Sequence, residues 1–212
     1  MANSNTAGFG LIPTGTIGST PATGGQGKYY IDAAYNADLF QGSVVQSKVG
    51  YIKTAQAAIT NLSIGVLNGI FYNAATTLKP TWANWYNQPI TPANSEDITA
   101  FVIDNPFQLF VCATDGAVAQ AGYGKTYGVT VTAAGSEISG QSSSTLTTGT
   151  VDVAANQWRL VRTAEDPSNN DMTAAYTSVI VAHNLNQYFT GAVSWAYSNR
   201  RLNYGNITST AS

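Results

Sequence analysis

Hydrophobic residues occur along most of the chain in short runs that glycine, asparagine and aspartate interrupt. The runs are rich in Val, Ile, Tyr, Phe and Thr, which suit the pleated, half-buried surface of a strand. Strands are predicted at residues 29–31, 44–46, 50–52, 64–71, 98–103, 109–113, 127–131, 157–161, 178–182 and 192–197. Because no helical runs separate them, the pattern predicts one all-β domain, a single β-barrel or a jelly-roll-like sandwich.

Three segments inside this domain have a different pattern. Residues 93–97 favour one short helix, which Asn94 would cap, and residues 53–61 favour a turn. Residues 133–150 are small and polar, so they form either an edge hairpin or a surface loop. The β-domain is therefore expected to run from residue 28 to residue 197, followed by a polar tail over 198–212.

Residues 1–27 are rich in Gly, Thr, Ser and Ala, and their apolar surface is too small to offset the cost of ordering them alone. Four apolar side chains are nevertheless spaced along them: Phe9, Leu11, Ile12 and Ile17. We expect an extended, flexible N-terminal arm that becomes ordered when these side chains contact a neighbouring subunit. A passive terminus is the alternative.

Charged residues make up only 9% of the chain, against roughly 25% in ordinary soluble domains. Uncharged polar residues take their place, so the surface loses little when it is desolvated against another protein. This composition favours a protein that lives in an assembly, and it is equally typical of an extracellular or phage-like β-protein. The formal net charge is −2 and the nine basic residues form no stripe, so a nucleic-acid partner is not expected.

No stretch of the chain approaches the ~18 apolar residues of a membrane helix. The N-terminus lacks the basic start and apolar centre of a signal peptide, so we expect synthesis in the cytoplasm and no membrane partner. The single cysteine, Cys112, lies in an apolar run and is predicted to be a core residue without a disulfide.

Candidate catalytic groups are sparse. The one histidine, His183, follows a predicted strand and has no GxSxG nucleophile motif to act on, so we expect a structural ring that hydrogen-bonds loop backbone. The segment GYGKTYG lacks the first glycine of a phosphate-binding loop. The carboxylates that a paired acid and base would need stand in turn sequences: Glu96, Asp97, Asp104 and Asp115. The chain is therefore not expected to be an enzyme or to carry a cofactor.

The one cluster of possible metal ligands is AEDPSNND, which contains Glu165, Asp166 and Asp171. Carboxylates in such a loop can bind calcium, but the alternating ligands and bidentate Glu of a calcium loop are missing. The composition is that of a tight turn, which we favour over a metal site.

The most unusual segment is KPTWANWYNQP, residues 79–89, which places Trp82, Trp85 and Tyr86 between two prolines. These rings could stack on a sugar, or they could pack over a barrel end or between subunits. Base stacking is less favoured because only Lys79 is nearby.

The order of several segments resembles the head decoration (cement) proteins of tailed marine phages, including podoviruses of cyanobacteria. The segments are LFQGSVV, VLNGIFY, KPTWANWY, EDITAFVIDNPFQLFVCATDG, a Gly/Ser-rich hairpin, WRLVRTAEDPSNND and VIVAHNLNQYF, and they span about residues 8–190. None of them is catalytic.

The resemblance implies a small β-barrel or jelly-roll protein on the capsid exterior of a virion, made in the host cytoplasm. Its partners would be the major capsid protein and further copies of itself, as a dimer or trimer. The interface residues would then be the apolar residues of the arm and the aromatic segment: Phe9, Leu11, Ile12, Ile17, Trp82, Trp85 and Tyr86. A carbohydrate-binding or host-recognition module of a virion, with Trp82, Trp85 and Tyr86 as its platform, is the alternative function.

Overall fold

The fold is known from a computed structural model, which describes residues 3–18, 25–55, 62–130, 134–152 and 156–188. It confirms the all-β prediction: two antiparallel sheets pack as a sandwich, and helix within these ranges is limited to two short 3₁₀ turns. The first sheet contains β1 (Ile12–Thr16), β8 (Gln108–Ala113), β9 (Thr126–Val129), β10 (Leu146–Val151), β11 (Trp158–Thr163) and β12 (Ser178–His183). The second contains β2 (Gly27–Ile31), β3 (Val44–Lys48), β4 (Tyr51–Thr54), β5 (Gly65–Asn73), β6 (Pro80–Ala83) and β7 (Ile98–Ile103).

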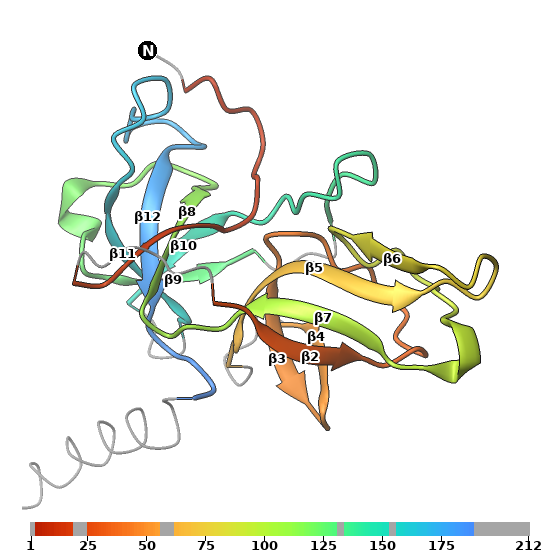
Figure 1. The fold of residues 1–212 in the computed structure, drawn as a ribbon. Coiled ribbons are helices and arrows are strands. Elements are labelled where there is room, and N and C mark those ends of the chain that lie inside the picture. The colour runs from red at the N-terminus through yellow and green to blue at the C-terminus, as the bar shows by residue number, and fades with distance from the viewer. Residues whose placement is uncertain (1–2, 19–24, 56–61, 131–133, 153–155, 189–212) are drawn as a thin grey trace, which may run out of the picture.

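The first sheet, sheet A, has the strand order β1-β8-β12-β11-β9-β10 (Figure 1). It does not stay open, because Leu146 at the start of β10 forms a parallel bridge with Thr114, just past the end of β8. The backbone N–H of Asp115 donates to the Leu146 carbonyl at 3.0 Å in the same place. Sheet A therefore curls toward a closed barrel around its own core.

The second sheet, sheet B, has the order β2-β7-β5-β3-β4, and β6 pairs with the far end of β5 (Figure 1). One face of sheet B holds its own hydrophobic core: Ile31, Leu39, Val45, Ile52, Ile64, Leu67, Ile70, Tyr86, Ile98, Ala100 and Val102. Val44, Val66 and Ile103 belong instead to the core of sheet A. The two sheets thus share buried contacts at one end of sheet B, while β6 and the adjacent end of β5 extend away from sheet A (Figure 1).

Every strand predicted within the described residues has a counterpart, and the prediction for 192–197 lies outside them. Three strands were not predicted as such: β1, β6 and β10. The expected helix at 93–97 is the 3₁₀ turn η1 (Ala93–Ser95), in which Asn94 has a positive φ of 57° and makes no side-chain cap. In the segment predicted as a turn at 53–61, β4 continues to Thr54 and residues 56–61 lie outside the description.

The N-terminal residues 3–18 do not form the flexible arm that their composition predicts. β1 pairs antiparallel with β8, where Ile12 lies opposite Val111, and Leu11 is only 1% exposed within the core of sheet A. β8 would otherwise be an edge strand with unpaired backbone groups, and β1 covers that edge. These residues are thus part of the domain.

The very start of the described chain is also held in place. The side-chain amide of Asn3 donates to the Ala175 carbonyl at 2.8 Å, and its oxygen accepts from the Asp171 N–H at 3.0 Å. The Asn5 N–H donates to the Asn169 side chain at 2.7 Å. Residues 3–5 therefore close over the loop that precedes β12. The predicted tail, 198–212, lies outside the described residues.

Candidate binding surfaces around residues 79–91

The structure sends the three rings of KPTWANWYNQP into three different environments. Trp82 lies on β6 and is 53% exposed, Trp85 is half-buried, and Tyr86 is completely buried. The three rings therefore do not form one platform, and the predicted three-residue sugar platform is wrong in that form.

Tyr86 belongs to the core of sheet B rather than to an outer surface. Its hydroxyl donates to the Tyr35 carbonyl at 2.7 Å, and its backbone exchanges two hydrogen bonds with Leu39. Burial raises the pKa of the Tyr86 phenol. The prediction of Tyr86 as an interface residue is therefore wrong, because its side chain is already enclosed by its own chain.

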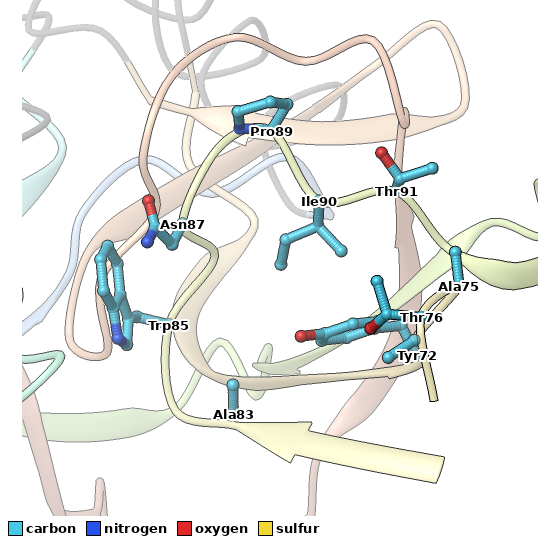
Figure 2. Close-up of a pocket in the computed structure, with 10 residues that line it drawn as sticks. Tyr72, Ala75, Thr76, Ala83, Trp85, Asn87, Pro89, Ile90 and Thr91 are labelled. Atoms are coloured by element: carbon cyan, nitrogen blue, oxygen red, sulfur yellow. The ribbon is translucent and has the colours of Figure 1, made fainter. Parts of the chain in front are cut away.

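Trp85 stacks on Phe40, with ring centroids 4.8 Å apart and planes 8° from parallel. It also lines a pocket of about 500 Å³ between the end of β5 and the segment after β6 (Figure 2). The walls of this pocket, called here the β5–β6 pocket, are formed by Tyr72, Ala74, Ala75, Thr76, Ala83, Trp85, Asn87, Pro89, Ile90 and Thr91. The peptide bond between Gln88 and Pro89 in its wall is cis.

β5 and β6 form a hairpin, and Trp82 points to the face of that hairpin opposite the β5–β6 pocket. On this face sheet B carries a group of exposed rings. The register places Trp82 opposite Phe71, Phe71 opposite Thr99, and Thr99 opposite Tyr30. Side chains in register share one face of a sheet, and Phe101, two residues beyond Thr99, joins them. We call Tyr30, Phe71, Trp82 and Phe101 the outer aromatic face.

Two rings of the outer aromatic face are in contact, and three of the four are exposed. Trp82 lies 5.1 Å from Phe101 between centroids, above Gly69, where an added Cβ would come within 2.5 Å of the indole. Tyr30 is 41% exposed, Phe71 38% and Trp82 53%. The absence of a side chain at Gly69 thus lets the Trp82 indole lie close to the sheet.

The four N-terminal residues that were predicted to contact a neighbouring subunit also lie in different environments. Leu11 fills the chain's own core, so its prediction as a contact to a neighbouring subunit is wrong. Phe9 is half-buried beside a groove of about 180 Å³. Ile12 and Ile17 remain exposed, at 44% and 53%. Only Phe9, Ile12 and Ile17 of this set still offer surface to another molecule.

His183 is enclosed by aromatic rings, not by loop backbone. Its ring centroid lies 4.2 Å from that of Trp158 and 5.7 Å from that of Phe110. The residue as a whole is half-buried, but both ring nitrogens are buried and neither has a hydrogen-bond partner. Burial lowers the pKa of His183 from 6.5 to about 3, so the ring is neutral. The expected hydrogen bond to backbone is therefore a wrong prediction, because β12 places the ring against Trp158 on β11.

The acidic residues stabilise turns. Asp166 accepts from the Asn169 amide and from the Ser168 N–H, at 2.7 and 3.0 Å, and these bonds hold its pKa below the usual value. Asp115 accepts from the Thr148 N–H at 2.7 Å. Within the described ranges, no group of three His, Cys, Asp or Glu residues is arranged to hold a metal ion.

Cys112 is completely buried on β8, as predicted, and burial raises the pKa of its thiol to about 12. The outer aromatic face is the feature that sequence analysis missed. Its signal was present: Tyr30, Phe71 and Phe101 alternate with buried neighbours in strands that were themselves predicted. The register between strands, which the sequence alone does not determine, was needed to bring them together.

No helix in the described part of the chain is long and apolar enough to cross a membrane. Comparison of the chain with protein-family models, with curated proteins and with solved structures found no match in any of the three.

Proposed function

We propose that the protein is a capsid decoration protein, which binds the outer surface of a virion and stabilises contacts between major capsid subunits. The observation that carries the proposal is the outer aromatic face, because its four rings share one face of sheet B, three of them are exposed, and two of them are in contact. Contiguous exposed apolar patches on soluble proteins mark sites of association. The resemblance in segment order to decoration proteins of marine phages points to the same function.

The chemistry around these rings favours a protein partner. Of the residues that β2, β5, β6 and β7 place on this face, Lys28 carries a charge, and Gly69, Asn73, Pro80 and Thr99 are neutral. The Asn73 amide, at the end of β5, donates to the exposed Glu96 carboxylate at 2.9 Å. The Lys28 ammonium lies 5.6 Å from the centre of the Tyr30 ring, at the margin of the patch. Cores of protein interfaces are similarly rich in aromatic residues and poor in charge. Little desolvation cost would oppose burying this face against a capsid subunit.

Attachment at many lattice positions would add to the strength of a single contact. A dimer or trimer of the chain would present several outer aromatic faces at once, and each additional contact would raise the overall affinity without new chemistry. Capsid subunits and further copies of the chain are the partners in this proposal, and no catalytic step is involved.

The proposal is tested by adding purified protein to capsids of the parent phage that lack it. Trp82→Ala removes the most exposed ring of the outer aromatic face, and we expect its apparent affinity to fall by roughly 30-fold, the equivalent of about 2 kcal/mol of lost apolar burial. Co-sedimentation at limiting protein concentration measures the occupancy.

The matched control is Val161→Ser, because Val161 is 38% exposed on β11 of sheet A, whereas the outer aromatic face lies on sheet B. The control should bind as the unchanged protein does. Equal occupancy for Trp82→Ala and for the unchanged protein, with both folded by circular dichroism, would remove the outer aromatic face from the capsid contact.

A further inference from the structure

We propose that the β5–β6 pocket binds one ring of a neutral carbohydrate. The pocket lies behind the β5–β6 hairpin, on the opposite side from the outer aromatic face, so this site is separate from the proposed capsid contact. The inference does not depend on the capsid function.

The size and shape of the pocket suit a small polar ligand. Its volume of about 500 Å³ falls in the range of ~300–1,000 Å³ that is usual for small-molecule sites. Trp85 and Tyr72 stand on opposite sides, and Ile90 projects between them (Figure 2). A flat ring entering between these side chains would meet apolar surface on both sides.

The aromatic wall is fixed before any ligand arrives. Phe40 stacks on Trp85 almost in parallel and so holds the indole in one orientation. The C–H groups of a sugar ring carry a slight positive charge and are attracted to the negative face of an aromatic ring. Because Trp85 is already immobilised, binding would cost little side-chain entropy there.

The backbone around the pocket is held at both ends. The Ala75 N–H donates to the Thr91 carbonyl at 3.3 Å, and a bridge joins Ala74 to Pro92. At the other end, the Gln88 N–H donates to the Asp38 carboxylate at 3.0 Å. These bonds fix the segment after β5 and the segment after β6, which form the two walls of the pocket, so the site is preformed.

Polar side chains of the pocket are available to a ligand. The Asn87 amide and the hydroxyls of Thr76, Thr91 and Tyr72 have no hydrogen-bond partner in the described chain. In Figure 2, Asn87 lies above Trp85, and Thr76 and Thr91 lie on the side of Tyr72. Hydroxyl and amide groups both donate and accept, which matches the hydroxyls around a sugar ring.

The absence of charged side chains in the pocket selects against ionised ligands. None of its ten lining residues is Lys, Arg, His, Asp or Glu. A carboxylate or phosphate entering it would lose hydration without gaining a counter-charge. Because Asn87, Thr76 and Thr91 are exposed and a sugar would replace their bound water, the affinity expected is weak, with a Kd of about 1 mM.

The experiment is saturation-transfer NMR on the full chain with methyl glycosides of glucose, galactose, mannose and N-acetylglucosamine, and with glucuronic acid as the charged probe. We expect at least one neutral glycoside to bind, and glucuronic acid to bind at least tenfold more weakly. Asn87→Ala and Thr91→Val, both at exposed positions, should each weaken binding by about fivefold. The Trp85→Ala variant should abolish it.

Trp82→Ala is the matched control, because it removes an indole from the other face of the same hairpin, and it should leave sugar binding unchanged. It also separates this proposal from the capsid proposal, in which the same variant lowers the apparent affinity for capsids by roughly 30-fold. The sugar site would be refuted if no neutral glycoside bound at about 10 mM, if Asn87→Ala and Thr91→Val both bound normally, or if Trp82→Ala abolished binding.

Discussion

His183 shows most clearly how burial acts on a single residue. Both ring nitrogens are buried without partners between Trp158 and Phe110. Desolvation disfavours the protonated ring, and this lowers its pKa to about 3. Sequence analysis placed His183 just after a strand, whereas it is the last residue of β12. The environment of its ring depends on its cross-strand neighbour Trp158, which only the register reveals.

This pKa predicts a pH dependence of stability. The unfolded chain takes up a proton on His183 near its ordinary pKa of 6.5, whereas the folded chain does so only near 3. As the pH falls through that window, the unfolded state binds more protons, so stability is lost by up to about 1.4 kcal/mol per pH unit. Above about pH 6.5 this contribution is fully present.

The test is urea unfolding of the unchanged protein and of His183→Phe at a series of pH values. Phe keeps an aromatic ring in the cage and cannot be protonated, so its stability curve should be flatter below pH 6.5. Parallel curves for the two proteins would mean that His183 is not buried in its neutral form.

At the scale of elements, runs of Val, Ile, Tyr and Phe were sufficient to predict the central strands of both sheets. The strands that escaped prediction lack such runs. β1 contains Pro13 and Gly15, and β10 reads LTTGTV. Their positions are set by the strands they pair with: β1 lies along the edge of β8, and β10 returns to the end of β8. That pairing is tertiary and leaves little local signal.

Leu11, the residue just before β1, provides a direct stability prediction. Leu11→Ala should lower the free energy of unfolding by about 2–5 kcal/mol, because it leaves a cavity in the core of sheet A. The neighbouring Ile12→Ala is the control and should cost well under that amount, since Ile12 is 44% exposed. Chemical denaturation measures both. A cost for Leu11→Ala no larger than that for Ile12→Ala would restore the flexible-arm interpretation.

At the scale of the whole molecule, the β5–β6 hairpin separates two surfaces with different chemistry. One side carries the outer aromatic face, and the other forms the β5–β6 pocket with uncharged polar groups. Sequence analysis singled out KPTWANWYNQP but did not predict β6, and it treated the three rings as one unit. Because successive strand residues point to opposite faces, the rings of such a segment are divided between surfaces. Low charge over both surfaces fits a protein that works in contact with others.

In the proposed function, the outer aromatic face attaches this protein to a capsid. A cryo-EM map of the parent particle tests this most directly. The two packed sheets would be recognisable in the density, and the bulky side chain of Trp82 would be visible at the contact. We predict density for the protein on the capsid exterior, with Trp82 and Phe71 buried against a capsid subunit or a second copy of the chain. A map in which the protein occupies the capsid exterior with both rings facing solvent would contradict the account, as would a particle that lacks the protein.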